Sequence, residues 1–508
     1  MICNAFYRFT QSLLLGMRCF YKTQSKKILC ILLAASGIVP MLTSCESKSV
    51  TKTDVTSETE IDIETAETET EYPQLELPVT DYNGATVTIM SALVEGTATS
   101  TRFAEFFYDE ELAGEGVNDA VLERNNIVEE LLNVEIVNND TTGDSIDTAL
   151  INQTVAGDTS VDIYTPYMQW VLGLITEGYL VDLYTMPVMN IENPWWDTAI
   201  NRDLGIAGKV FMQGGDILFS SKELHAFLCV NQKILSNHNL EIPYELVFEG
   251  KWTLDVMYDM CSELTVDLSG DGILDHNDQI AYTDSPDGSY WLFVDAGGSF
   301  VDLNASGELV VNSNMEHNVA VLEKLAKFYG NSNVFLNVEK MPNTWTTNRE
   351  MFMNDQIAFR SASIYNLQST REMVSDFGIL PTPKYDEQQE DYVNCPTSFR
   401  MLTITIPVTN TRLELTGSVL EALAYYSKDT TVEAYYDANL QRKVSRDDES
   451  RRVLEIIFST VTYDLIESYR WGDIFNIVCN NVEDPSSFIS QYTSGESAMI
   501  SDMEKTYT

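Results

Sequence analysis

The chain has 508 residues, 44% of them hydrophobic, and carries 77 Asp or Glu against 31 Lys or Arg, for a formal net charge of −46 at pH 7. Five of the basic residues and none of the acidic ones precede residue 45, so the remainder has 26 basic and 77 acidic residues, a net charge of −51. A body this acidic argues against nucleic acid and anionic lipid as partners, and it is compatible with neutral or cationic ligands and divalent cations.

The N-terminal segment has the pattern of an export signal over residues 1–44. Two lysines precede the apolar stretch ILCILLAASGIVPML (28–42), which suits a signal peptide and is too short for a membrane-spanning helix. The tetrapeptide Leu-Thr-Ser-Cys at residues 42–45 resembles the bacterial lipobox. The resemblance implies cleavage before Cys45 and a lipid on that residue. The alternative is an ordinary signal peptide followed by a chance cysteine.

Residues 46–71 are rich in Thr and Glu and have no periodic apolar face. Such a composition cannot bury enough surface to offset chain entropy, so a disordered, self-repelling tether is predicted over 45–76. Lipid, tether and body together predict a protein held at the outer face of the cytoplasmic membrane of a Gram-positive-type bacterium, and we expect this protein to be a monomer. The cysteines of the body, none of them in a CxxC, are predicted to be free thiols, with two disulfides as the alternative: Cys229, Cys261, Cys395 and Cys479.

The first elements of the body alternate between strand and helix. Strands are predicted at 85–90, 134–138 and 161–167, with helices at 117–133 and 144–157. The short connections predict a parallel sheet with covering helices. No GxGxxG or GxxxxGK[ST] lies at the strand–helix turns, which argues against a nucleotide site. Further along, strands are predicted at 208–218, 223–231, 377–384 and 399–408, helices at 252–264 and 314–329, and mostly helix at 411–475.

Several stretches resemble extracellular solute-binding proteins of family 1, the maltose-binding type, and most closely the large clostridial lipoproteins that serve ABC importers. They include NDAVLERNNIVEELLNVEI (118–136), NPWWD (193–197), LEIPYELVFEGKWTLDVM (240–257), DAGGSF (295–300) and DFGILPTPKYDEQQEDY (376–392). The resemblance implies a two-lobed α/β fold of type II, each lobe a mostly parallel sheet flanked by helices, with a ligand cleft between the lobes. It assigns 77–218 plus 358–408 to lobe 1 and 219–357 plus 409–508 to lobe 2.

The stretch DLSGDGILDHND (267–278) has the spacing of a calcium-binding loop. Gly272 at position 6 permits a sharp turn, and oxygen-only ligands favour a hard cation such as calcium. No nucleophile or paired base is evident beside the loop, so a structural rather than a catalytic ion is predicted. The alternative is a solvated acidic turn without metal. The predicted ligands are Asp267, Ser269, Asp271, Asp275 and Asp278 with the carbonyl of Ile273.

Aromatic and polar residues supply the candidate ligand site. Sugar rings present C–H faces that stack on Trp and Tyr, and their hydroxyl groups need carboxylate, amide or guanidinium partners. For any single residue of this set, ordinary packing is the alternative interpretation, and Trp195 and Trp196 in NPWWD are predicted to pack rather than bind. The candidates are Tyr164, Tyr167, Trp170, Asp216, Trp291, Trp345, Arg360, Ser363, Tyr365 and Trp471.

Catalytic motifs are missing from the sequence. The four histidines lie in no HExxH or triad context, and no GxSxG occurs. We therefore expect a non-enzyme without a catalytic cofactor, which captures a carbohydrate, in particular an oligosaccharide, and delivers it to the permease of an ABC importer. The alternatives are a surface glycan hydrolase or lyase, and a sensory or adhesive binding lipoprotein. A peptide, a polyamine or another organic cation is the alternative ligand.

Overall fold

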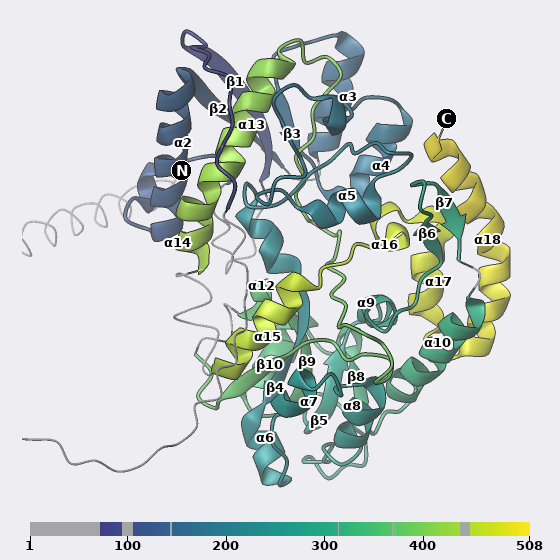
Figure 1. Cartoon of the computed structure of the whole chain (residues 1–508). Coiled ribbons are helices and arrows are strands. Elements are labelled where there is room, and N and C mark those ends of the chain that lie inside the picture. The colour runs from purple at the N-terminus through teal and green to yellow at the C-terminus, as the bar shows by residue number, and fades with distance from the viewer. Residues whose placement is uncertain are drawn as a thin grey trace, which may run out of the picture. The chain divides into compact units, whose positions relative to one another are not determined.

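The computed structural model (Figure 1) describes residues 72–93, 105–142, 145–312, 314–367, 370, 372–436 and 448–507. The chain divides into two units, Met1–Thr70 and Glu71–Thr508, and all the features below belong to the second. The predicted signal peptide, Cys45 and almost all of the tether lie outside the described residues. No helix within the described ranges is long and apolar enough to cross a membrane.

Lobe 1 is built on a parallel three-stranded sheet of order β2–β1–β3. Ala85 pairs with Val134 and Ile89 with Ile163, so the predicted strand–helix alternation is confirmed. The first two helices each end at a residue in the left-handed region, Asn133 (φ 50°) and Gly157 (φ 65°). The elements are β1 (Ala85–Leu93), η1 (Glu110–Leu112), α2 (Gly116–Leu132), β2 (Val134–Thr142), α3 (Ile146–Ala156), β3 (Ile163–Thr165), α4 (Met168–Thr176), η3 (Leu183–Thr185) and α5 (Thr198–Leu204).

Lobe 2 is built on a five-stranded sheet of order β10–β4–β9–β5–β8. β4 runs antiparallel to β10 and β9, whereas β5 is parallel to β9 and β8, so this sheet is mixed. Its elements are η4 (Phe219–Leu224), β4 (Ala226–Asn231), α6 (Gln232–Asn237), α7 (Tyr244–Phe248), α8 (Leu254–Cys261), β5 (Ile280–Asp284), α9 (Gly288–Asp295), β6 (Val301–Leu303), β7 (Leu309–Val311), α10 (Met315–Tyr329), β8 (Phe335–Asn337), η5 (Val338–Lys340), α11 (Trp345–Met353), β9 (Ile357–Ser363), α12 (Ile364–Leu367) and β10 (Phe377–Leu380).

The C-terminal helices serve both lobes. α13 lies beside α2 of lobe 1 (Figure 1), with Tyr82 and Ser418 hydroxyls 2.9 Å apart, while α15 packs against β10 of lobe 2. α16 contacts α4 of lobe 1 and β6 of lobe 2. The elements are α13 (Leu413–Ser427), η7 (Lys428–Val432), α14 (Glu433–Tyr436), α15 (Asp448–Ser459), α16 (Leu465–Tyr469), η9 (Trp471–Asp473), α17 (Ile474–Asn481) and α18 (Pro485–Tyr507).

The lobe boundaries need correction. β9 and β10 pair with β4, so most of 358–408 belongs to the sheet of lobe 2 rather than to lobe 1. The chain rejoins lobe 1 only at 402–407, where Leu402 and Thr405 bridge to Tyr167 and Tyr164. α13, assigned from the resemblance to lobe 2, packs on lobe 1.

Two packing predictions are confirmed. Trp195 and Trp196 are buried, and both indole N–H groups donate to the buried carboxylate of Glu421. The cysteines of the body are free and buried: Cys229, Cys261, Cys395 and Cys479.

Candidate functional site

The site follows from the topology of the two sheets. In open α/β sheets, ligands bind beyond the carboxyl ends of the parallel strands. β3 ends at Thr165 and leads into α4, and β5 ends at Asp284 and leads into α9. The predicted residues Tyr167 and Trp170 therefore follow a strand end in lobe 1, and Trp291 follows one in lobe 2.

On the lobe 1 side, Tyr167 and Trp170 form an aromatic pair. Their ring centroids are 5.0 Å apart; Tyr167 is buried and Trp170 half-buried. The N–H of Met168, in the first turn of α4, donates to the carbonyl of Met401 at 2.7 Å. This bond brings the segment 398–401, which joins lobe 2 to lobe 1, against α4. Phe399 in that segment is 52% exposed.

On the lobe 2 side, the half-buried Trp291 reaches the same segment through Glu467 of α16. Trp291 Nε1 lies 3.5 Å from Glu467 Oε1, and the N–H of Ser398 donates to both carboxylate oxygens at 2.9 and 3.0 Å. Arg470 Nη2 donates to Oε1 at 3.1 Å. Burial raises the pKa of Glu467, and Arg470 and Ser398 oppose that shift. We call this group the inter-lobe aromatic site: Tyr167, Trp170, Trp291, Phe399, Glu467 and Arg470.

Asp216 lies elsewhere, in a cavity of about 270 Å³ at the first crossing between the lobes. Its carboxylate is 3.6 Å from Lys222 Nζ; burial raises the pKa of Asp216 and Lys222 opposes the shift. His225 lines the same cavity and hydrogen-bonds to Asn394 at 2.8 Å. Burial lowers the pKa of His225 to about 4, so this imidazole is neutral at physiological pH.

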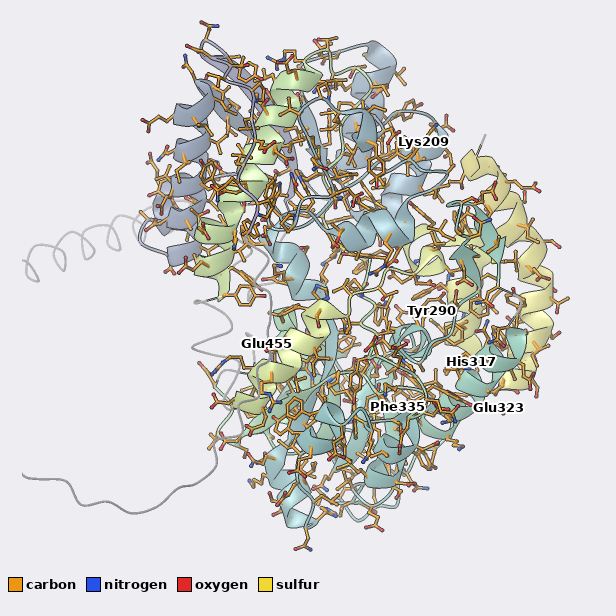
Figure 2. All side chains as sticks on the ribbon, in the orientation of Figure 1. Lys209, Tyr290, His317, Glu323, Phe335 and Glu455 are labelled. Carbon is orange, nitrogen blue, oxygen red and sulfur yellow. The ribbon has the colours of Figure 1, made fainter. Side chains whose placement is uncertain are left out.

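A larger cavity of about 420 Å³ has walls from both lobes, with Arg202 and Asp203 of lobe 1 opposite residues 297–303 of lobe 2. Asp464, at the start of α16, also lines it and accepts the hydroxyl hydrogen of Tyr290 at 2.8 Å. Tyr290 lies on α9 and is labelled in Figure 2. Burial raises the pKa of Asp464 to about 6.

Three predicted ligand contacts are placed in the cores of the lobes. Tyr164 is buried and donates to Gln153 at 2.8 Å; Arg360 is buried and donates to Asn348 at 2.6 Å. Trp471 is buried. For these three, ordinary packing, the alternative interpretation, fits the structure.

The last three candidates lie along the carboxyl ends of lobe 2 strands. Trp345 is 45% exposed at the start of α11, and Ser363, at the end of β9, donates from its N–H and hydroxyl to Asn366 Oδ1. The backbone of Tyr365 lies in α12, and its side chain is outside the described residues.

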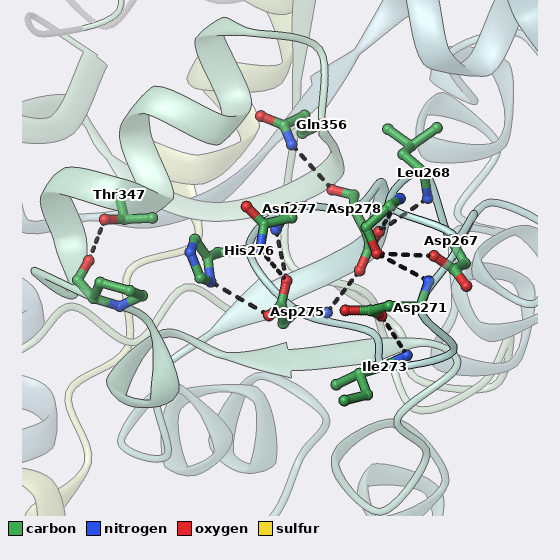
Figure 3. A network of polar contacts seen from close by, with 12 residues as sticks. Asp267, Leu268, Asp271, Ile273, Asp275, His276, Asn277, Asp278, Thr347 and Gln356 are labelled. Atoms are coloured by element: carbon green, nitrogen blue, oxygen red, sulfur yellow. Dashed lines mark hydrogen bonds and ion pairs between the residues drawn. The ribbon is translucent and has the colours of Figure 1, made fainter.

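The acidic loop holds its turn with its own side chains (Figure 3). The buried Asp278 accepts the N–H groups of Leu268, Ser269 and Asp275 at 2.9, 3.0 and 3.0 Å, and Asp267 accepts that of Gly272 at 2.9 Å. Burial acts to raise the pKa of Asp278, but these N–H groups outweigh it and hold the pKa below its ordinary value. Among the described residues, no three His, Cys, Asp or Glu side chains are grouped to hold a metal ion.

Residues 128–437 match the family of bacterial extracellular solute-binding proteins, a span of more than half of the chain. The chain belongs to this family. The binding protein also shares its fold with solved structures at 12–13% identity. A cyclic α-maltosyl-1,6-maltose binding protein from Arthrobacter globiformis has 13% identity and a TM-score of 0.53, over 83% of this chain and 99% of the other. A family 1 extracellular solute-binding protein from Bifidobacterium longum subsp. infantis has 12% identity and a TM-score of 0.52, over 84% of this chain and 99% of the other. UspC of M. tuberculosis has 13% identity and a TM-score of 0.54, over 82% of this chain and 100% of the other. No match was found among curated proteins.

Three residues of the aromatic site of this binding protein were missed by the sequence analysis: Phe399, Glu467 and Arg470. The predicted candidate Trp471 directly follows Arg470 in the chain. Arg470 has a left-handed backbone (φ 56°), which ends α16 and turns Trp471 into the core. A local break of this kind leaves no periodic signal in the sequence.

Proposed function

We propose that this binding protein captures a carbohydrate, in particular an oligosaccharide, outside the membrane and delivers it to the permease of an ABC importer. The observation that carries the proposal is the inter-lobe aromatic site, where the segment 398–401 is bonded to the start of α4 in lobe 1 and, through Glu467, to Trp291 of lobe 2. Half-exposed rings of Trp170, Trp291 and Phe399 suit the C–H faces of sugar rings, while Arg470 suits their hydroxyl groups. The name of the Arthrobacter relative, a maltosyl-maltose binding protein, supports the same ligand class.

Ligand uptake in such a protein proceeds by a hinge motion. Both lobes contribute to the site, so a sugar bound there contacts both and favours the arrangement in which they enclose it. Binding of the enclosing form to permease subunits then commits the cargo to transport. A lipid on Cys45 would hold the monomeric protein near its permease, at the outer face of a Gram-positive-type membrane.

The proposal is tested by isothermal titration of mono- and oligosaccharides into the full chain, followed by analysis of the recovered sugar. We expect one sugar class to bind and to be recovered unchanged. Trp291→Ala should weaken that binding at least ten-fold. Tyr184→Ala, at an exposed aromatic residue of lobe 1, is the matched control and should leave it unaltered. A panel in which no carbohydrate binds would refute the assignment, and cationic and peptide ligands would then be tested.

We further propose that the loop 267–278 takes up a calcium ion with a structural role. The order of its oxygen-bearing residues, with Gly272 in the left-handed region (φ 79°), supports this proposal. Uptake would require the carboxylates of Asp271 and Asp275, now bonded to nearby backbone N–H groups, to turn toward the ion.

A further inference from the structure

We propose that Glu467 is a positioning residue that couples occupancy of the inter-lobe aromatic site to the relative movement of the two lobes. The inference rests on the proposed ligand-binding function of that site and assigns its mechanical link to one carboxylate. Neither the family nor the ligand class specifies such a link. It follows from the segments that converge on this side chain.

Glu467 joins three separate segments of the chain. Its side chain is 1% exposed and lies on α16. Its oxygens accept the N–H of Ser398, in the segment that leads to lobe 1, and lie within reach of the indole N–H of Trp291 in lobe 2. When the segment that contains Ser398 moves relative to Trp291, the carboxylate of Glu467 cannot keep both contacts unchanged.

The link continues into lobe 1 through the backbone. The carbonyl of Met401, three residues after Ser398, accepts the N–H of Met168 at 2.7 Å, and Thr403 N–H donates to Pro166 at 3.0 Å. The hydroxyl of Ser468, next to Glu467, lies 3.8 Å from the sulfur of Met168. The start of α4, which carries the aromatic pair of lobe 1, is thus tied to the segment that holds Glu467.

The contacts of Glu467 differ in strength, and the difference shows which one responds to a ligand. The two bonds from Ser398, at 2.9 and 3.0 Å, are of normal length, whereas the bond from Trp291, at 3.5 Å, is at the limit of a hydrogen bond. The carboxylate of Glu467 is therefore bonded more closely to Ser398 than to Trp291. A sugar stacked on Trp291 alters the weak contact first, by shifting the indole toward or away from the carboxylate.

Lobe 1 contains a chemically matched pair that makes no such link. Glu421 is also a buried carboxylate that accepts an indole N–H, from Trp196 at 2.9 Å, but both residues belong to lobe 1. Disrupting this pair should lower stability without altering how the lobes move. It therefore separates a positioning role from a merely structural one.

The test measures the distance between the lobes in the full chain by electron–electron double resonance. Spin labels are carried on a ketone-bearing amino acid at the exposed positions 123 and 263, which leaves the native cysteines untouched. Without ligand, we expect Glu467→Gln to change the ratio of lobe arrangements about five-fold, and Trp291→Phe, which removes only the 3.5 Å contact, to change it about two-fold. Glu421→Gln and Trp196→Phe should keep the wild-type distances.

Each outcome of this experiment decides the inference. Unchanged distances in the first two variants, equal changes in all four, or a change in Glu467→Gln alone would overturn the coupling through Trp291. The ligand-free distances test the coupling by themselves. Maltotetraose, added as the probe, tests the ligand class separately: coupling without a sugar response would overturn the proposed function and leave the mechanical link in place.

Discussion

Replacing Glu421 by Gln is the sharpest test of how the core of lobe 1 is held together. The carboxylate is 2% exposed and accepts four N–H groups. One oxygen accepts from Asn193 Nδ2 at 2.6 Å and Trp195 Nε1 at 3.1 Å. The other accepts from Trp196 Nε1 at 2.9 Å and the backbone N–H of Asn190 at 3.2 Å.

The expected loss of stability in Glu421→Gln follows from the buried N–H groups that lose their acceptor. Glutamine keeps one carbonyl oxygen and replaces the other with an NH2 group, so two of the four N–H groups face a donor instead of an acceptor. Each unmatched buried donor costs ~1–3 kcal/mol. Removal of the buried charge offsets part of that loss, because burial already disfavours the ionised form and raises the pKa of Glu421. We therefore expect a net loss of ~2–4 kcal/mol in the free energy of unfolding.

The assay is urea unfolding followed by circular dichroism, with wild type and variant at the same pH. Glu414→Gln, at an exposed position of the same helix α13, is the control and should lie within ~0.5 kcal/mol of wild type. If Glu421→Gln lost no more stability than Glu414→Gln, the four donors would not depend on this carboxylate, and the account of the NPWWD stretch would be refuted.

Three further predictions concern a buried ion pair, pH and calcium. Arg412→Ala removes the partner of the buried Asp162 (Nη2–Oδ2 2.6 Å). This substitution should lower the free energy of unfolding, measured in urea, by ~2 kcal/mol. The loss is smaller than the ~3–5 kcal/mol expected for breaking a fully buried pair, because Arg412 is 40% exposed. An unchanged unfolding midpoint would contradict this prediction. Burial raises the pKa of Asp295 to about 8, above ~3.9 in the unfolded chain, so the folded protein retains a proton and stability falls as pH rises from about 4 to about 8. Asp295→Asn should remove that decline in melting experiments between pH 5 and pH 9, and parallel curves for both proteins would speak against it. Calcium added to metal-free protein should raise the melting temperature, less so in Asp271→Asn and undiminished in the exposed control Asp259→Asn; no calcium response in wild type would exclude the ion.

The sequence predicts best those features that depend on neighbouring residues. Alternating strand and helix patterns gave lobe 1 in the correct order because the period of apolar residues reports which face of each element is buried. The packing of Trp195 and Trp196 in NPWWD was predicted as well, and both are buried. The partner of these tryptophans could not be predicted, because Glu421 lies more than 220 residues away.

The lobe boundaries depend on pairing between strands that are distant in the sequence, and the local residue pattern says little about which strands pair. β9 has the same apolar composition whichever sheet it joins, and only its pairing with β4 and β5 assigns it to lobe 2. In the candidate site, Trp471 is predicted because an aromatic residue at this point of the chain suits the cleft that the family resemblance implies. The left-handed conformations of Arg470 (φ 56°) and Asp473 (φ 59°) interrupt the helix there, and they decide which side chain faces outward.

Glu421 and Glu467 show why such a site cannot be identified from residue types alone. Each is a buried glutamate on a helix, each accepts an indole N–H, and each has a pKa raised by burial. In one case all partners belong to lobe 1, so the bonds add only to stability. In the other, the partners belong to lobe 2 and to the segment leading to lobe 1. The same kind of hydrogen bond therefore acts on the movement of one lobe relative to the other. The role of a buried carboxylate in a two-lobed protein is therefore set by which segments it joins, and that information exists only in the folded chain.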